Sequence, residues 1–126
     1  MLRIVGVQRS GEPETEFVLL QNQGIFRVCL RGHLVADEDA FLDGGRMDWD
    51  RTFAFGDDVS IPPKAYVMLV TGYGDDGWGK SKDGSQVYYK FWQRGEVVWS
   101  LSNRPLHVLG VLHSKVVRPS PQLAAQ

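Results

Sequence analysis

Residues 26–37, FRVCLRGHLVAD, alternate between apolar and polar side chains over most of their length. The apolar set is Phe26, Val28, Leu30 and Leu34, and the set between them is Arg27, Cys29, Arg31 and His33. Successive side chains of a β-strand point to opposite faces, so a period of two indicates a strand rather than a helix. The segment therefore predicts one β-strand with a buried face and an exposed face.

Further strands are predicted on both sides of this segment. Residues 16–22 and 65–72 are apolar at both parities, which is typical of strands that are covered on both faces or lie centrally in a sandwich. Residues 86–92, 96–101 and 105–112 are rich in Val and aromatic residues, and turn signals separate them. Short strands thus recur along the chain.

Evidence for helix is confined to residues 37–47, where Asp37 or Asp39 is placed to cap a single turn before two glycines end it. A chain of 126 residues is sufficient for one domain with its own core. We therefore expect an all-β fold, a sandwich of immunoglobulin-like size with seven to nine strands and little or no helix. The sandwich is expected to span residues 1–118, followed by a flexible tail at 119–126.

Composition limits the classes of function. The formal net charge is −1, but residues 37–58 carry eight acids against two bases, whereas residues 77–126 carry seven bases against two acids. No apolar run is long enough to span a membrane, and the first residues do not resemble a signal peptide, so we expect a cytoplasmic protein without membrane contact. Cys29 is the only cysteine, which excludes an internal disulfide and a multi-cysteine zinc site.

Residues 74–81, GDDGWGKS, satisfy the pattern of a phosphate-binding loop and follow an apolar run. Such a loop works with the first turn of a helix that directly follows it. Here Asp83-Gly84 is a turn signal and residues 86–92 are strand formers, so that helix is not expected. Asp75 and Asp76 also place negative charge where phosphates would bind. We interpret the motif as a glycine-rich connection between two strands.

No other pattern predicts catalysis or a cofactor. His33, His107 and His113 have no adjacent carboxylate in the sequence and do not form a metal-ligand spacing, although His107 and His113 are expected to lie near each other. No nucleophile elbow is present. The acidic residues 37–50 leave calcium binding as an alternative, without the spacing of a known calcium loop. The sequence therefore predicts a non-enzymatic protein with no cofactor and no assigned metal site.

The first half of the chain resembles the lamin-tail domain, an immunoglobulin-like module of nuclear lamins and of many bacterial proteins. The similarity begins at Glu16, Phe17, Val18 and Asn22, and continues through Val28, Leu30, Gly32, Leu34 and Asp37. It then follows Phe53, Phe55, Pro62, Pro63 and the strand Tyr66 to Val70. His33 stands where that family usually has Trp, and the acidic segment 37–51 is longer than its usual connection. The resemblance implies an immunoglobulin-like sandwich that serves as an interaction module.

The aromatic residues between 73 and 92 form the candidate binding site, namely Tyr73, Trp78, Tyr88 and Trp92. Large aromatics dominate the energetics of interfaces, and a strand at a sheet edge invites strand addition. Core packing of these side chains is the competing interpretation. We expect a protein partner or a homo-oligomer. The alternative is a small-ligand, carbohydrate or nucleic-acid binder that uses residues 73–84 and the basic C-terminal half.

Overall fold

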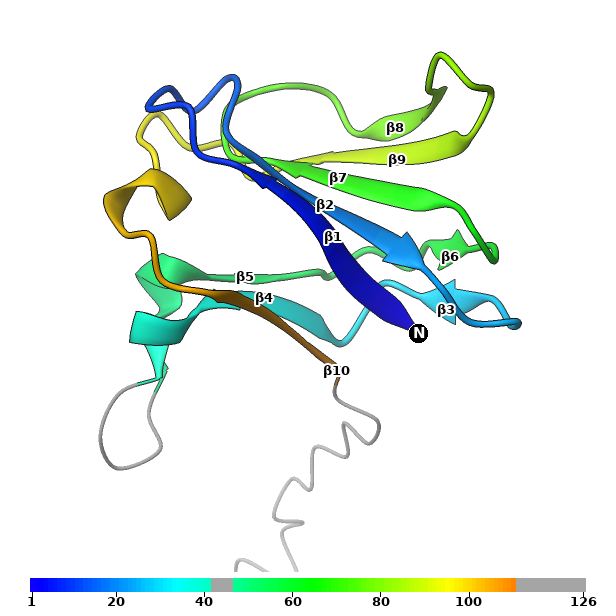
Figure 1. Ribbon diagram of the computed structural model, residues 1–126, viewed down its shortest axis with the longest axis horizontal. Helices are drawn as coiled ribbons and strands as arrows, with labels where there is room; N and C mark the ends of the chain where they lie inside the picture. Colours follow the sequence, from blue (N-terminus) through cyan, green and yellow to red (C-terminus); the bar gives the residue numbers. More distant parts are fainter. Residues whose placement is uncertain (42–46, 111–126) are drawn as a thin grey trace, which may run out of the picture.

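The computed structural model describes residues 1–41 and 47–110. Within these residues ten strands form a β-sandwich, with one five-stranded sheet above two smaller sheets (Figure 1). Helical structure in the described residues is limited to single 3-10 turns. The predicted all-β sandwich is confirmed. It has ten strands rather than seven to nine, and two of the ten, β3 and β6, are only two residues long.

The larger sheet has the strand order β1-β2-β7-β9-β8. Its strands are β1 (Leu2–Gln8), β2 (Phe17–Asn22), β7 (Tyr66–Val70), β9 (Gln86–Phe91) and β8 (Gly77–Lys80). Neighbouring strands are antiparallel except β7 and β9, which run parallel. The predicted strands at 16–22, 65–72 and 86–92 are thus confirmed, and all three lie in the interior of this sheet.

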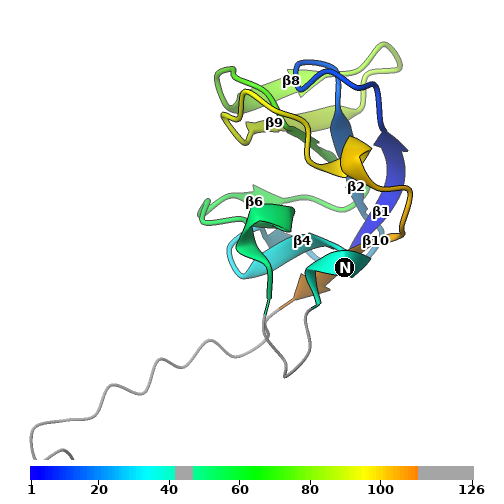
Figure 2. The ribbon, with the colours of Figure 1, turned by 90° about the vertical axis from the view of Figure 1, so that its left-hand side faces the viewer.

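The opposite layer contains two short sheets. One has the order β10-β4-β5, with β10 (Leu106–Gly110), β4 (His33–Asp37) and β5 (Thr52–Ala54). The other pairs β3 (Val28–Cys29) with β6 (Ser60–Ile61). The 3-10 turns are η1 (Glu38–Ala40), η3 (Trp49–Arg51) and η4 (Trp99–Leu101), and they lie at the end of the sandwich opposite β3 and β6 (Figures 1 and 2).

The core lies between the two layers. Val18, Leu20, Val67 and Leu69 contribute from the larger sheet, and Leu30, Val35, Phe53 and Ile61 contribute from the opposite layer. Trp99 is fully buried among them. Burial of apolar surface is the main force that stabilises such a domain, so these side chains hold the sheets together.

The prediction of one continuous strand over residues 26–37 is wrong. Gly32 adopts a φ of 89°, and the N–H of His33 closes a turn onto the carbonyl of Leu30 at 3.1 Å. This turn separates β3 from β4, and after it three successive residues, Val35, Ala36 and Asp37, are buried, so the alternation of buried and exposed residues does not continue. Phe26, which the alternation places on the buried face, is 77% exposed.

The prediction of a strand over residues 96–101 is also wrong. The backbone N–H groups of Val98, Trp99 and Ser100 donate to the buried carboxylate of Glu16 at 2.9, 3.0 and 2.8 Å. Donors that bind a side chain are not available to a β-ladder, and the segment forms η4 instead. The neighbouring prediction at 105–112 is confirmed for β10, whose last described residue is Gly110.

The predicted helical turn is present. Asp37 precedes η1, and its side chain accepts the N–H of Asp39 at 2.8 Å, as an N-terminal cap does. The two glycines that were expected to end it, and the predicted boundary between residues 118 and 119, lie outside the described residues.

Candidate interaction surface

Strand β8 lies at the edge of the larger sheet and pairs with β9 alone (Figure 1). The N–H of Ser81 donates to the carbonyl of Ser85 at 2.9 Å, so these two residues form a hydrogen-bonded pair in the same register. Hydrogen-bonded and non-hydrogen-bonded pairs alternate along an antiparallel ladder. The backbone groups of Gly77 and Gly79 therefore point toward β9.

It follows that the N–H and C=O groups of Trp78 and Lys80 point away from β9, toward the open edge. The hydrogen bonds of β9 show the same alternation. The N–H of Trp92 donates to the carbonyl of Val70 on β7 at 2.8 Å, and the N–H of Phe91 donates in the opposite direction, to the Asp76 carboxylate at 2.9 Å. Two residues of β8 thus offer backbone donors and acceptors to solvent.

Local side chains define the length of β8. The Asp76 carboxylate accepts the N–H of Phe91 where the next backbone acceptor of β8 would lie, and it also pairs with Lys90 at 2.8 Å. At the other positions glycine makes room for aromatic rings. A Cβ on Gly79 would lie 2.9 Å from the Tyr89 ring, and a Cβ on Gly74 would lie 2.5 Å from the Phe91 ring.

The structure does not bring the four predicted binding residues onto one surface. Tyr73 and Trp78 are 67% and 47% exposed, whereas Tyr88 is 7% exposed. Trp92 packs edge-on against Phe53, with 5.2 Å between ring centroids, and contacts Trp99 in the core. The parallel register of β9 beside β7 directs Tyr88 and Trp92 to the inner face, so packing accounts for these two residues.

Tyr88 belongs to a polar cluster at the rim of the core. Its hydroxyl donates to Asp57 at 2.9 Å, and Lys90 contacts both Asp57 and Asp76. Burial and the charge of Asp57 raise the pKa of Tyr88 to about 12. For Lys90, burial alone would lower the pKa, but the two carboxylates outweigh it and raise the pKa. Both groups stay protonated at neutral pH, and the cluster ties the β5–β6 loop to β9.

The outer face of the larger sheet has a groove of about 430 Å³ beside the β8–β9 turn. Its apolar lining comes from Leu19, Tyr66, Met68, Val87 and Tyr89. Parallel strand pairs are normally covered on both faces, whereas within residues 1–41 and 47–110 the groove leaves part of the outer face of β7 and β9 open. The sequence prediction did not identify these residues as a site. The signal for it was that residues 65–72 are apolar at both odd and even positions, which places apolar side chains on both faces of the strand.

The open edge of β8 with Trp78, together with this groove, is called the hairpin surface below. The indole of Trp78 lies on the same side of the sheet as its cross-strand partner Tyr88, whereas the groove lies on the opposite side with Tyr89. Successive side chains of a strand added along β8 would face these two sides in turn. Such a surface can accept a strand along β8 and apolar side chains in the groove.

The phosphate-loop motif has no nucleotide-binding geometry. Residues 77–80 of the motif form β8 itself, so the interpretation as a plain connection between strands was incomplete. Ser81 begins the turn into β9, and its hydroxyl bonds to Asp83 rather than standing at the start of a helix. Lys80 is therefore an exposed edge-strand residue.

The histidines and acidic residues serve local structure. His33 Nδ1 lies 3.1 Å from the carbonyl of Leu30, and His107 Nε2 lies 3.5 Å from Glu38. His113 lies outside the described residues. Among residues 1–41 and 47–110, no group of three His, Cys, Asp or Glu side chains is placed to hold a metal ion. Asp48 caps η3 as Asp37 caps η1, so these acids have structural partners.

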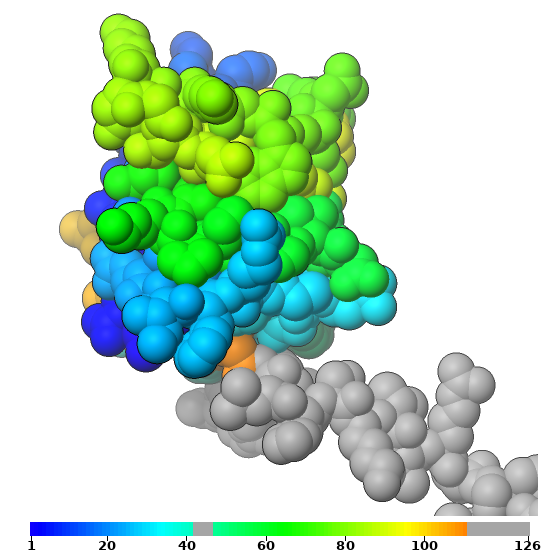
Figure 3. Space-filling view, turned by 90° about the vertical axis from the view of Figure 1, so that its right-hand side faces the viewer, coloured from blue at the N-terminus to red at the C-terminus, as the bar shows by residue number. Residues whose placement is uncertain are grey.

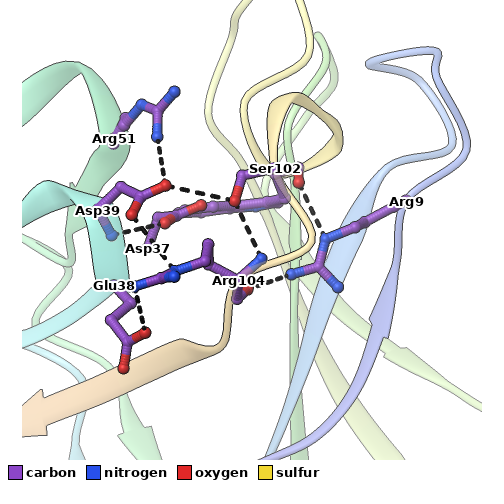
Figure 4. A network of polar contacts seen from close by, with 8 residues as sticks. Arg9, Asp37, Glu38, Asp39, Arg51, Ser102 and Arg104 are labelled. Carbon is purple, nitrogen blue, oxygen red and sulfur yellow. Dashed lines mark hydrogen bonds and ion pairs between the residues drawn. The ribbon is translucent and has the colours of Figure 1, made fainter.

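Arginines connect the acidic segment to the rest of the sandwich (Figure 4). Arg104 pairs with Glu38 at 3.1 Å and with Asp39 at 3.4 Å, and Arg51 approaches Asp39 from the other side. Arg9 reaches across from the end of β1 and donates to the carbonyls of Trp99 and Arg104 at 2.9 and 2.7 Å. The network holds η4 and the start of β10 against η1.

The nucleic-acid alternative would use bases of the C-terminal half, among them Lys80, Lys82, Lys90, Arg94, Arg104 and Lys115. Lys90 and Arg104 bind carboxylates, and the guanidinium of Arg94 lies over the Trp92 ring at 5.0 Å. Lys115 lies outside the described residues. Three of the bases that the structure places are therefore engaged by contacts within the domain.

The described residues contain no helix with the length and apolar character needed to cross a membrane. Comparison of the chain with protein-family models, curated proteins and solved structures finds no match in any of the three.

Proposed function

We propose that the domain is a non-enzymatic protein-interaction module that binds its partner through the hairpin surface. The observation that carries the proposal is the open edge of β8, where the backbone groups of Trp78 and Lys80 point away from the sheet. Unpaired edge groups are a template for strand addition, in which backbone hydrogen bonds supply affinity and neighbouring side chains supply specificity.

The groove supports the same proposal. A partner strand added to β8 extends the sheet, and its side chains can reach the Tyr89 ring, which lies over Gly79 of β8 at the rim of the groove. Parts of the partner beyond that strand would cover the groove around Met68. Trp78 stands at the edge with its ring 5.4 Å from that of Tyr88, so it offers a supported aromatic surface. Rigid aromatic side chains are common energetic centres of interfaces.

We also propose that the module is of the lamin-tail type, with an immunoglobulin-like arrangement. In the segment that carries the resemblance, Glu16 and Asn22 are fully buried and each binds several backbone groups. Polar residues with such fixed packing roles are expected in a family pattern that encodes a fold. The resemblance supports an interaction role rather than catalysis.

A small-ligand module is the second candidate. A groove of about 430 Å³ falls within the range of small-molecule sites, which span roughly 300–1,000 Å³. Binding of a drug-sized apolar compound would shift the methyl resonance of Met68 and would leave that of Met1 unchanged. A screen in which no compound shifts Met68 would remove this candidate.

Site-specific photo-crosslinking in cells of the source organism tests the protein-interaction proposal. A photoreactive phenylalanine analogue replaces Met68 in the groove, and a matched chain carries it at Leu101, which is 64% exposed outside the sheet. We expect a discrete protein adduct from position 68 alone. The adduct should disappear when Tyr89→Lys is added, and the identified partner should bind the purified domain.

The same two crosslinking positions, 68 and 101, also define the result that would contradict the proposal. If positions 68 and 101 give the same adducts, or if position 68 gives none, the hairpin surface is not where the domain contacts proteins.

A further inference from the structure

The end of the sandwich beside β3 and β6 is organised by the buried side chain of Asn22. Its amide nitrogen donates to the carbonyls of Phe26 and Ile61, both at 2.9 Å. Its oxygen accepts from the N–H of Gly24 and from the amino group of Met1, both at 3.0 Å. A single side chain thus joins the β2–β3 loop to β6 and to the start of β1.

This arrangement presents two large apolar residues at the tip of the β2–β3 loop. Ile25 and Phe26 are 83% and 77% exposed, more than any other large apolar side chain of the described residues. Their loop is tied down by the Asn22 contacts. Gly24 is required there, because a Cβ would lie 2.8 Å from the nitrogen of Met1. The tip is therefore a built feature of the fold.

Basic side chains surround the tip. Arg27 adjoins Phe26 in the chain, Arg3 is opposite Gln21 in the β1–β2 ladder, and the N–H of Lys64 donates to the carbonyl of Asn22. All three are exposed, and none forms an ion pair within the residues that the structure describes. Figure 3 faces this end, where the sky-blue loop lies beside the green β6–β7 turn.

From this arrangement we infer that the tip of the β2–β3 loop docks on an anionic lipid bilayer. Ile25 and Phe26 enter the interface between headgroups and acyl chains, while Arg3, Arg27 and Lys64 contact lipid phosphates and carboxylates. Apolar insertion combined with attraction to anionic lipid is the usual basis of peripheral membrane binding.

This inference is independent of the hairpin surface, because it rests on different residues. It revises the expectation of no membrane contact, because that expectation rested on the lack of a spanning segment, and a spanning segment is not needed for surface binding. The acids that the contacts place near this end are Asp57 and Asp58 of the β5–β6 loop. Asp57 pairs with Lys90, and the carboxylate of Asp58 lies 3.5 Å from the sulfur of Cys29.

Co-sedimentation with lipid vesicles tests the inference. The full chain is mixed with vesicles of phosphatidylcholine alone or of phosphatidylcholine with phosphatidylserine. We expect binding to the vesicles that contain phosphatidylserine, weaker binding at high salt, and little binding to the neutral vesicles, since exposed charges are screened by salt.

Variants identify the residues in contact with lipid. Phe26→Asp and Ile25→Asp should each lower the partition coefficient at least about tenfold, because each removes a large apolar side chain from the inserted surface. Trp49→Asp is the matched control, since Trp49 is 61% exposed at the opposite end and its change should leave partitioning unaltered. Lys64→Glu should weaken binding to anionic vesicles only.

A fluorescent label provides a second readout. An environment-sensitive dye on Ile25→Cys, in a chain that also carries Cys29→Ser, should shift its emission to the blue with anionic vesicles. The inference is overturned if the folded wild-type chain does not bind anionic vesicles at low salt, or if Phe26→Asp binds as well as wild type. It is also overturned if the tip mediates a dimer in sedimentation and the vesicles do not compete with that dimer.

Discussion

The N–H of Trp99 donates to the carboxylate of Glu16 at 3.0 Å, although the two residues are 83 positions apart in the chain. The same carboxylate accepts from Val98, Ser100 and the hydroxyl of Thr71. A side chain at the start of β2 thus fixes the turn η4 and the end of β7 together. The Glu16 carboxylate thereby holds Trp99 in the core, shortly before the chain enters β10.

Glu16→Ala should be strongly destabilising. Removing the carboxylate leaves several buried donors without an acceptor, which should cost at least about 3 kcal/mol in the free energy of unfolding. Glu14→Ala is the matched control, because Glu14 is exposed two positions earlier and its loss should change stability by less than about 0.5 kcal/mol. Urea denaturation measures both. Equal stability of the two variants would contradict the role assigned to Glu16.

The stability of the domain should depend on Glu16 at acidic pH. Burial alone would raise the pKa of Glu16, but hydrogen bonds from Ser100, Thr71, Val98 and Trp99 outweigh it and hold the pKa below its usual value. A carboxyl with a lowered native pKa stabilises the fold above the unfolded pKa of about 4.3, and this contribution is lost as the pH falls through the native pKa.

Unfolding free energies measured from neutral pH down to pH values below the native pKa should therefore fall on the acid side. The same series with Glu16→Gln should be flatter there, because the glutamine does not titrate. Identical acid profiles for the two chains would show that Glu16 does not contribute to the pH dependence.

Trp92 and Trp78 should differ in what their removal affects. Trp92→Ala removes a ring from the Phe53–Trp92–Trp99 core cluster and should cost about 3–5 kcal/mol of stability. Trp78→Ala should leave the melting temperature nearly unchanged and weaken binding of the partner captured through Met68. Thermal melts and a binding titration separate the two effects. A large loss of stability from Trp78→Ala would place Trp78 in the core rather than at the interface.

Nucleotides should not bind the motif at residues 74–81. Lys80 is an exposed residue of β8 with no helix after it, so ATP and GTP should bind no more tightly than millimolar. Lys80→Ala should not alter the fold. Isothermal calorimetry with each nucleotide checks this, and micromolar affinity that disappears in Lys80→Ala would overturn the prediction.

The strands that were predicted correctly are those whose apolar pattern and turns are local. Residues 16–22, 65–72 and 86–92 carry enough β-branched and aromatic residues to form strands in any sheet arrangement. Residues 96–101 carry the same kind of pattern but form η4, because their backbone donors are bound by Glu16 from far away in the sequence. A window along the chain does not contain that partner.

The candidate site was predicted only in part, because it too depends on contacts between distant parts of the sequence. Local pattern indicated large aromatics in 73–92, but the direction of each side chain depends on the register of β9 against β7, which is a long-range property. That register buries Tyr88 and directs Trp92 against Phe53 and Trp99, while Trp78 on the edge strand β8 is exposed. The groove depends on Leu19, Tyr66 and Tyr89, which meet only after three strands have paired.

Amide hydrogen exchange, read residue by residue, tests the open edge of β8 most directly. In the isolated chain we expect fast exchange at Trp78 and Lys80 and slow exchange at Gly77, Gly79 and Ser81, because only the latter donate into the ladder with β9. With the partner captured through Met68 bound, Trp78 and Lys80 should become protected. If these two amides are already protected in the isolated chain, or remain unprotected in the complex, β8 is not the edge through which the domain binds.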